Sequence, residues 1–426
     1  MLRFLLSFLL LLLLPSTGMK AQEATASVPF DTLGQEMKRR LDAITTDELL
    51  QRSQLGLYVY DLTADRPLYT YGHRQRMRPA STMKVITAIV ALDKLGGDYR
   101  YHTRFYTTAP LDSIVRGHLI IHGGFDPLFS HDDLGAIISI LRNAGVRRIE
   151  GNILLDLSMK DANLMGWGWC WDDNTVPLNP LLYRGEDHFI IQLEKVLAEA
   201  GITLDGNIHE GVVTGDAELL LIRTHSIQQV LVPMMKRSDN LFAESLFYQI
   251  AASAGKLYAG RSEAVKVMED FVRKIGLSPD HYQFADGSGL SLYNYVSPEL
   301  LVAALRYAYR HEAVFNSLVP SLPVMGRDGT LRKRCLNSSA QNRVWAKTGT
   351  VDGVSSLAGY ATAPNGHLLA FAIINQGIAK AAIGRRFQNR VCKALTAPYN
   401  ALIPAPVDNS DEDEDEALPT DTLAAA

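Results

Sequence analysis

The sequence contains only three cysteines, Cys170, Cys335 and Cys392. So few cysteines cannot build a disulfide framework, and the fold must depend on a packed core. Two interpretations stay open: one bridge with one thiol left over, or three unpaired and mostly buried thiols. The cysteines are not spaced as a metal site and the motif H-E-x-x-H does not occur, so we expect no metal ion.

An excess of charge of either sign is also lacking. The chain has 42 Lys and Arg against 46 Asp and Glu, a net charge of −4, which argues against a nucleic-acid-binding protein. Apolar residues make up 47% and charged residues 21% of the 426 residues. Both fractions are ordinary for a globular protein, and the length predicts two or three domains.

Long hydrophobic runs are confined to the N-terminus. The apolar stretch 4–14 follows Arg3 and precedes small residues, a pattern typical of a signal peptide, here residues 1–21 with cleavage after Gly18 or Ala21. An uncleaved anchor is the alternative. No cysteine lies directly after the stretch, so the sequence shows no lipoprotein attachment site, and no later segment reaches transmembrane length,. We therefore expect an exported, periplasmic protein without a transmembrane segment, and leave peripheral membrane association open.

The hydrophobic periodicity predicts alternating helices and strands. The predicted helices are 31–52, 81–95, 132–144, 187–200, 226–235, 241–254 and 385–395. The predicted strands are 55–61, 67–71, 101–107, 118–122, 151–156, 343–350, 355–362 and 367–375. The last three strands are joined by turn residues, which indicates an antiparallel meander closed by a helix, so the fold class is α/β or α+β.

The middle of the chain alternates strand and helix on its own, which favours a separate α/β domain inserted at 101–217. The main domain then consists of two segments, 24–100 and 218–404. The end of the chain, 405–426, is acidic and contains proline, and we expect a disordered tail.

One candidate reactive pair lies at the start of the helix 81–95. Ser81 and Lys84 are three residues apart, so they share a helix face, and the residues that follow are apolar all round,. Burial and the positive end of the helix both favour a neutral lysine, which could take a proton from the serine. Taken alone, a capping serine and a solvated lysine explain the pair as well. The same spacing recurs at Ser253 and Lys256.

Two further motifs lie downstream. In S-D-N at 238–240, Ser238 can relay a proton and Asn240 can orient a substrate amide, although the motif could also cap the next helix. In K-T-G at 347–349, Lys347 and Thr348 can hold a carboxylate, and Gly349 lets a ligand approach the strand. The three motifs occur in the order found in class A β-lactamases and penicillin-binding proteins.

Longer motifs carry a more specific resemblance. The chain resembles the penicillin-binding protein 4 family of D-alanyl-D-alanine carboxypeptidases and endopeptidases across most of its mature length. The matching stretches are P-A-S-T-M-K-V-I-T-A (79–88), G-F-D-P-L (124–128), G-N-I-L-L-D (151–156), D-G-S-G-L-S (286–291) and G-R-D-G-T-L (326–331). The resemblance implies a penicillin-recognising, β-lactamase/transpeptidase-like catalytic domain: an antiparallel sheet with helices on both faces, interrupted by an inserted α/β domain. The 157 residues (238 − 81) between the first two motifs agree with an interruption.

The resemblance also implies a role for each site residue. These roles are Ser81 as the acylated nucleophile, Lys84 as its base, Ser238 as proton relay, Asn240 as the amide contact, Lys347 and Thr348 as carboxylate ligands, and the backbone N–H groups of Ser81 and Thr350 as the oxyanion hole. In W-C-W-D-D, Asp173 would contact the free amino group of a diamino acid in the peptidoglycan stem. Cys170 departs from the residue usual at its position, and a merely solvated Asp173 is the alternative.

The implied reaction is acyl transfer from peptidoglycan stem peptides and cross-links to a serine, without a cofactor and inhibited by β-lactams. A β-lactamase is one alternative, because the stretch from Glu312 to Asn316 resembles E-x-x-L-N. It lies 72 residues (312 − 240) after Asn240, too far for the class A pattern. A non-catalytic peptidoglycan-binding or sensor protein is the other, and the intact motif side chains argue against it.

Overall fold

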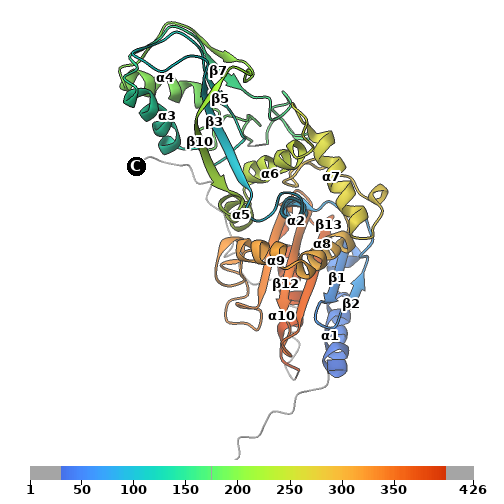
Figure 1. Cartoon of the computed structure of the whole chain (residues 1–426). Helices are drawn as coiled ribbons and strands as arrows, with labels where there is room; N and C mark the ends of the chain where they lie inside the picture. The colour runs from blue at the N-terminus through green and yellow to red at the C-terminus, as the bar shows by residue number, and fades with distance from the viewer. Residues whose placement is uncertain (1–29, 174, 400–426) are drawn as a thin grey trace, which may run out of the picture.

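The computed structural model describes residues 30–173 and 175–399. The predicted signal peptide and acidic tail lie outside these residues. The described chain forms two stacked parts, with a five-stranded sheet in the lower one and a second sheet in the upper one (Figure 1). The α/β fold class predicted from the sequence is confirmed.

The main sheet is antiparallel and has the order β11-β12-β13-β1-β2. Its strands are β1 (Gln54–Asp61), β2 (Arg66–Tyr71), β11 (Val344–Val351), β12 (Val354–Thr362) and β13 (Leu368–Gln376). The predicted meander therefore forms, and the pairing of β13 with β1 joins the two ends of the chain in one sheet. Strand β11, which carries K-T-G, is left at an edge.

Helices cover both faces of the main sheet because its side chains alternate between two cores. Ala372 and Ile374 of β13 belong to the cluster that contains helices α2 (Met83–Leu95) and α8 (Pro298–Arg310). Phe371 and Ile373 belong to the cluster on the other face, under α1 (Phe30–Ile44) and α10 (Ala381–Thr396). Every residue of α2 from Met83 to Leu92 is buried, so this helix lies inside the protein, as its all-apolar pattern predicts.

The second sheet has the order β10-β3-β5-β7-β9. Its strands are β3 (Arg100–Thr107), β5 (Leu119–His122), β7 (Ile153–Asp156), β9 (Ile208–Glu210) and β10 (Glu218–Ser226), and it packs with α3 (His131–Asn143) and α4 (Phe189–Glu199) around a separate core. A small parallel sheet joins β4 (Ile114–Val115), β6 (Arg148–Ile149) and β8 (Thr203–Leu204). Since β10 pairs with β3 along its whole length, we propose that the inserted unit is residues 100–226, nine residues (226 − 217) beyond the boundary expected from the sequence.

Several predicted helix bounds need correction. The helix predicted over 31–52 ends at Ile44, and a separate short 3-10 helix follows at Glu48–Gln51. Asp47 caps this second helix, because its side chain accepts a hydrogen bond from Leu49 N at 2.9 Å. Helices α5 (Ile227–Lys236), α6 (Asn240–Ala252) and α10 match predicted ones closely. Helices α7 (Arg261–Lys274), α8 and α9 (Glu312–Leu318) were not predicted.

Three sequence-based expectations concern what the chain lacks. All three cysteines are free thiols, Cys335 and Cys392 buried and Cys170 exposed. Within residues 30–173 and 175–399, no helix is long and apolar enough to cross a membrane. The same residues hold no cluster of side chains suited to a metal ion.

The enclosed position of α2 predicts a large stability cost for truncating it. Ile89→Ala should lower the free energy of unfolding by about 2–5 kcal/mol, because Ile89 is completely buried and its removal leaves a cavity. Ile190→Ala, on the half-exposed start of α4, is the matched control and should cost about 1 kcal/mol or less. Urea unfolding of both variants checks this, and equal costs would contradict the buried placement of α2.

Candidate active site

Ser81 lies on a tight turn that leads into α2. The turn, Ala80–Thr82, precedes the helix itself, so the predicted helix start at residue 81 is corrected to Met83. Ala80 has a φ of 48°, a left-handed conformation that an alanine adopts only under constraint from its surroundings. The Ser356 hydroxyl supplies one such constraint by donating to Pro79 O at 2.6 Å.

Strand β11 runs directly beside this turn. A Cβ atom added to Gly349 would lie 2.9 Å from Ser81 N and 2.2 Å from Ser356 Oγ. Any side chain at this position would therefore displace the backbone of Ser81 or the side chain of Ser356. The glycine of K-T-G is needed for the close packing of strand and turn.

The Lys84 side chain is completely buried and has three hydrogen-bond partners. Its Nζ donates to Ser81 Oγ at 2.9 Å, to Asn240 Oδ1 at 2.7 Å and to Ser288 O at 2.9 Å. A neutral amine has only two N–H groups. The asparagine and the backbone carbonyl can take both, which leaves the nitrogen lone pair directed at the Ser81 hydroxyl.

Burial lowers the pKa of Lys84 to about 8, because it penalises the ammonium,. Nearby carboxylates of Asp286, Glu244 and Asp239 oppose this shift. Since the ordinary value is near 10.5, the lysine has a substantial neutral fraction close to neutral pH. The sequence-based expectation of a desolvated lysine therefore agrees with its burial, and its role as a base stays a prediction.

The S-D-N motif caps a helix, and two of its side chains also contact the buried lysines. Asp239 caps α6, since its side chain accepts from Phe242 N at 3.3 Å. Asn240, the first residue of α6, directs its side-chain oxygen at Lys84. Ser238 has a φ of 65°, strain that the surrounding structure must hold.

Lys347 connects K-T-G to S-D-N. Its buried Nζ donates to Ser238 Oγ and to Thr348 O, both at 2.7 Å. Burial, together with the charge of Lys84, moves the pKa of Lys347 well below its usual value. Thr348 Oγ1 donates to Thr330 Oγ1 at 2.9 Å, and Thr350 lies exposed further along β11. The three motifs therefore meet at one place, although they are far apart in the sequence.

The loop from Asp286 to Asn294 packs against this site, although none of the three motifs includes it. Asp286 accepts from Gly289 N, Ser291 N and Asn294 Nδ2, each at 2.7 Å. A Cβ atom on Gly289 would lie 1.9 Å from Ala80 O, so this loop packs directly against the turn that carries Ser81. The D-G-S-G-L-S match was the only sequence signal for it.

Asp173 lies in the tryptophan-rich stretch, half-buried, where its carboxylate accepts from Cys170 N at 2.7 Å. This bond closes a local turn. The stretch is tied to the site by Trp169, whose Nε1 donates to Asp286 Oδ2 at 2.9 Å.

The alternative candidates do not join the site. Ser253 ends α6 and donates to Ile250 O at 2.6 Å, while Lys256 pairs on the surface with Glu263. Glu312 is the exposed first residue of α9. It begins a helix at the protein surface, unlike the buried side chains of Lys84 and Lys347.

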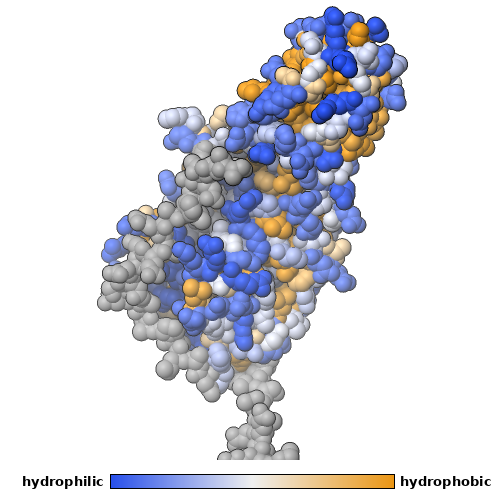
Figure 2. Space-filling model, turned by 90° about the vertical axis from the view of Figure 1, so that its left-hand side faces the viewer, coloured by the Kyte–Doolittle hydropathy of each residue, from blue (hydrophilic) through white to orange (hydrophobic). Residues whose placement is uncertain are grey.

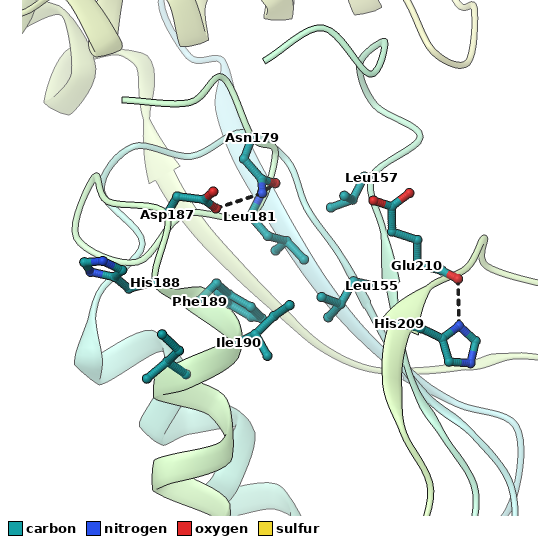
Figure 3. Close-up of a pocket in the computed structure, with 11 residues that line it drawn as sticks. Leu155, Leu157, Asn179, Leu181, Asp187, His188, Phe189, Ile190, His209 and Glu210 are labelled. Carbon is teal, nitrogen blue, oxygen red and sulfur yellow. Dashed lines mark hydrogen bonds between the residues drawn. The ribbon is translucent and has the colours of Figure 1, made fainter. Parts of the chain in front are cut away.

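The inserted unit contains a separate cavity of about 500 Å³ between β7, β9 and the start of α4 (Figure 3). Its floor is apolar, with Leu155, Leu181 and Phe189, and Asp187 and Glu210 lie at its rim. Figure 2 shows hydrophobic side chains gathered on the surface of the same upper part. None of the predicted site residues lines this cavity.

Comparisons with known proteins agree with the geometry. The model of the D-Ala-D-Ala carboxypeptidase 3 (S13) family matches residues 37–182 and 184–397. The chain is 23% identical to D-alanyl-D-alanine carboxypeptidase DacB of Haemophilus influenzae, over 76% of this chain and 86% of that protein. It is 27% identical to a D-alanyl-D-alanine carboxypeptidase of an Actinomadura species, over 86% and 85%.

A solved structure is similar over nearly the whole fold. Penicillin binding protein 4 of Haemophilus influenzae superposes with a TM-score of 0.75 at 22% identity, covering 85% of this chain and 98% of that one. The same Haemophilus protein has also been solved in complex with a β-lactam. The resemblance inferred from the motifs is confirmed.

The lowered pKa of Lys84 predicts the pH dependence of serine reactivity. Only the neutral amine can accept the Ser81 proton, so the rate of acylation by a fluorescent penicillin should be low in acid and rise with pH. The midpoint should lie near the Lys84 pKa of about 8,. Stopped-flow measurement between pH 5 and 10 checks this. A rate independent of pH across that range would contradict a titrating base.

Proposed function

The chain belongs to the D-Ala-D-Ala carboxypeptidase 3 (S13) family and is a serine-type D-Ala-D-Ala carboxypeptidase, and we propose that Ser81 is the nucleophile of its reaction. Its substrates are peptidoglycan stem peptides and their cross-links. The observation that carries the assignment is the 2.9 Å contact between Lys84 Nζ and Ser81 Oγ at a buried amine whose two other acceptors are fixed.

Acylation begins with proton transfer from Ser81 Oγ to the neutral Lys84. The serine oxygen attacks the carbonyl carbon before the terminal D-alanine, and the backbone N–H groups of Ser81 and Thr350 stabilise the oxyanion. When the C–N bond breaks, the leaving amine takes a proton delivered through Ser238, which Lys347 holds at 2.7 Å. An acyl-enzyme on Ser81 remains.

Deacylation reverses the proton path. Lys84 is neutral again because its first proton has gone to the leaving amine. A water molecule attacks the ester carbonyl and Lys84 takes a proton from it, then returns that proton to Ser81 Oγ as the ester C–O bond breaks. No step requires a metal or another cofactor. A β-lactam would enter the first half-reaction in the same way, because its ring amide takes the place of the scissile peptide. The β-lactam complex of the similar Haemophilus protein supports this.

Substrate binding follows from the edge position of β11. An extended peptide can lie along this edge as an added strand. Asn240 gives its side-chain oxygen to Lys84, so its Nδ2 is available for the substrate carbonyl. Lys347 and Thr348 supply an amine and a hydroxyl for the terminal carboxylate, whose negative charge would favour the ammonium form of the buried lysine,.

Export to the periplasm is the location that this function requires, since peptidoglycan lies outside the cytoplasmic membrane. The apolar N-terminal stretch of the sequence supports it. β-Lactams act as covalent inhibitors there, and peripheral contact with the membrane is compatible with this location.

Replacing the nucleophile gives the first test. Ser81→Ala should abolish both labelling by a fluorescent penicillin and release of D-alanine, a loss of about 10³-fold or more, because no other group can form the acyl-enzyme. Ser253→Ala, in the second S-x-x-K sequence, is the matched control and should keep full activity. Gel fluorescence and a D-alanine assay measure both variants, and persistent labelling of the Ser81 variant would refute the assignment.

Asp173 gives a second test, of substrate selection. We propose that its carboxylate binds the free amino group of a diamino acid in the stem peptide. Asp173→Ala should lower kcat/KM for stems with a free amino group about 10-fold, the cost of one charged contact, and should leave N-acetylated analogues unaffected.

Asp172→Ala, next in sequence and exposed, is the control for this test. Peptide cleavage followed by mass spectrometry measures the two substrates in parallel. Equal losses on free and blocked stems, or the same loss for Asp172→Ala, would rule Asp173 out as the amine contact.

A further inference from the structure

Glu244 is a buried carboxylic acid next to the active site that none of the three motifs includes. It lies one helical turn after Asn240 on α6 and is only 1% exposed. Its Oε1 accepts from Ser288 N at 2.8 Å and from Gly287 N at 3.1 Å, and Oε2 lies 3.2 Å from the same Gly287 N. A buried charge of this kind is costly unless several donors satisfy it.

The peptide segment that Glu244 holds is the one that orients the base. Ser288 O accepts from Lys84 Nζ at 2.9 Å, and Gly287 O accepts from Thr87 Oγ1 at 2.7 Å. The amide groups of 287 and 288 therefore bind α6 through their N–H groups and α2 through their carbonyls. This segment connects the two helices that carry Asn240 and Lys84.

Close packing makes the connection rigid. A Cβ atom on Gly287 would lie 2.6 Å from Phe247 Cβ and 2.8 Å from Ala243 O, so the loop rests directly on α6. A shift of Glu244 would move the Ser288 carbonyl with it, and the lone pair of Lys84 would turn away from Ser81.

We propose that Glu244 is a positioning residue for the serine acylation, acting through the Ser288 carbonyl on Lys84. The carboxylate fixes one of the two acceptors that take the N–H groups of the neutral amine. Its charge also stabilises the ammonium that forms when Lys84 takes the serine proton. The proposal rests on the role of Lys84 as the base for Ser81.

The charged groups around Glu244 give the direction of the electrostatic effect. Asp286 faces it from the loop and Tyr248 lies on its own helix, while Lys84 on α2 carries the opposing charge. The charge of Asp239, just before α6, raises the pKa of Lys84. The charge of Lys84 in turn lowers the pKa of Lys347 on β11. Burial first, and Asp286 second, raise the pKa of Glu244 to about 8, against the backbone N–H bonds that lower it.

The Glu244 carboxyl has a pKa of about 8, so it ionises in the same pH range in which Lys84 loses its proton. In its ionised form it favours the ammonium, and removing it therefore lowers the lysine pKa,. The acid limb of the acylation profile then moves to lower pH. Loss of the acceptor for Gly287 N and Ser288 N loosens the lysine's orientation, which lowers the plateau rate at high pH.

The test compares two variants of the full mature chain by stopped-flow acylation with a fluorescent penicillin, corrected by burst amplitude for active enzyme. Glu244→Gln should move the acid limb to lower pH, by less than one pH unit because Glu244 is itself only partly ionised there, and should reduce the plateau about 10-fold. Glu244→Asp keeps the charge on a shorter side chain, so it should leave the limb in place and reduce the plateau. Ser245→Ala, the buried neighbour on α6, is the control and should behave as wild type.

Each outcome decides the proposal. A Glu244→Gln profile with the wild-type midpoint and plateau would overturn it, and so would a lower plateau without any shift of the limb, which a purely structural role would give. If Glu244→Gln does not fold, Glu244→Asp decides, because an unchanged plateau would overturn the proposal. An equal loss in Ser245→Ala would also overturn it. Failure of the proposed function itself is distinguishable, because the wild-type protein would then not be acylated.

Discussion

The active site depends on one buried amine with a fixed set of acceptors. Lys84 is completely buried and has no contact with solvent, so its protonation state is set by the groups that surround it. Asn240 Oδ1 and Ser288 O hold its two N–H groups at 2.7 and 2.9 Å, and Ser81 Oγ lies at 2.9 Å in the third direction. In the proposed reaction the same geometry serves the neutral base before proton transfer and the ammonium after it, so the protein would reorganise little.

Helix α2, strand β11 and the loop after α7 together enclose this amine and the turn that carries Ser81. Helix α2 is buried on all sides, which removes water from Lys84 and lowers its pKa. The nucleophile turn lies between strand β11 and the loop after α7, and it fits there only because Gly349 and Gly289 lack side chains. Ala80, with a φ of 48°, lies in this turn, whereas Ser238, with a φ of 65°, is held by the hydrogen bond from Lys347,.

Sequence patterns revealed the parts of the site that are local. Ser81 and Lys84 are three residues apart, and each of the three motifs has its own helix, turn or strand, so their meeting could be inferred from the family resemblance. The contacts of Lys84 with Asn240 and Ser288 span 156 and 204 residues, and no periodicity reports on such distances. Glu244 was missed for this reason, because one acidic residue on an apolar helix shows nothing of the loop that it binds.

In the fold, too, repeated sequence patterns could be predicted, whereas features set by a single side chain could not. The meander and the buried helix were predicted from alternation and from continuous apolar residues, whereas the break after Ile44 depends on a single Asp47 side-chain bond. NMR titration of isotopically labelled lysine, with Lys84 assigned by its absence in Lys84→Arg, tests the central claim most directly. We expect the Lys84 amine to titrate with a midpoint near pH 8. A midpoint near 10.5, with the lysine charged throughout the range of activity, would contradict it.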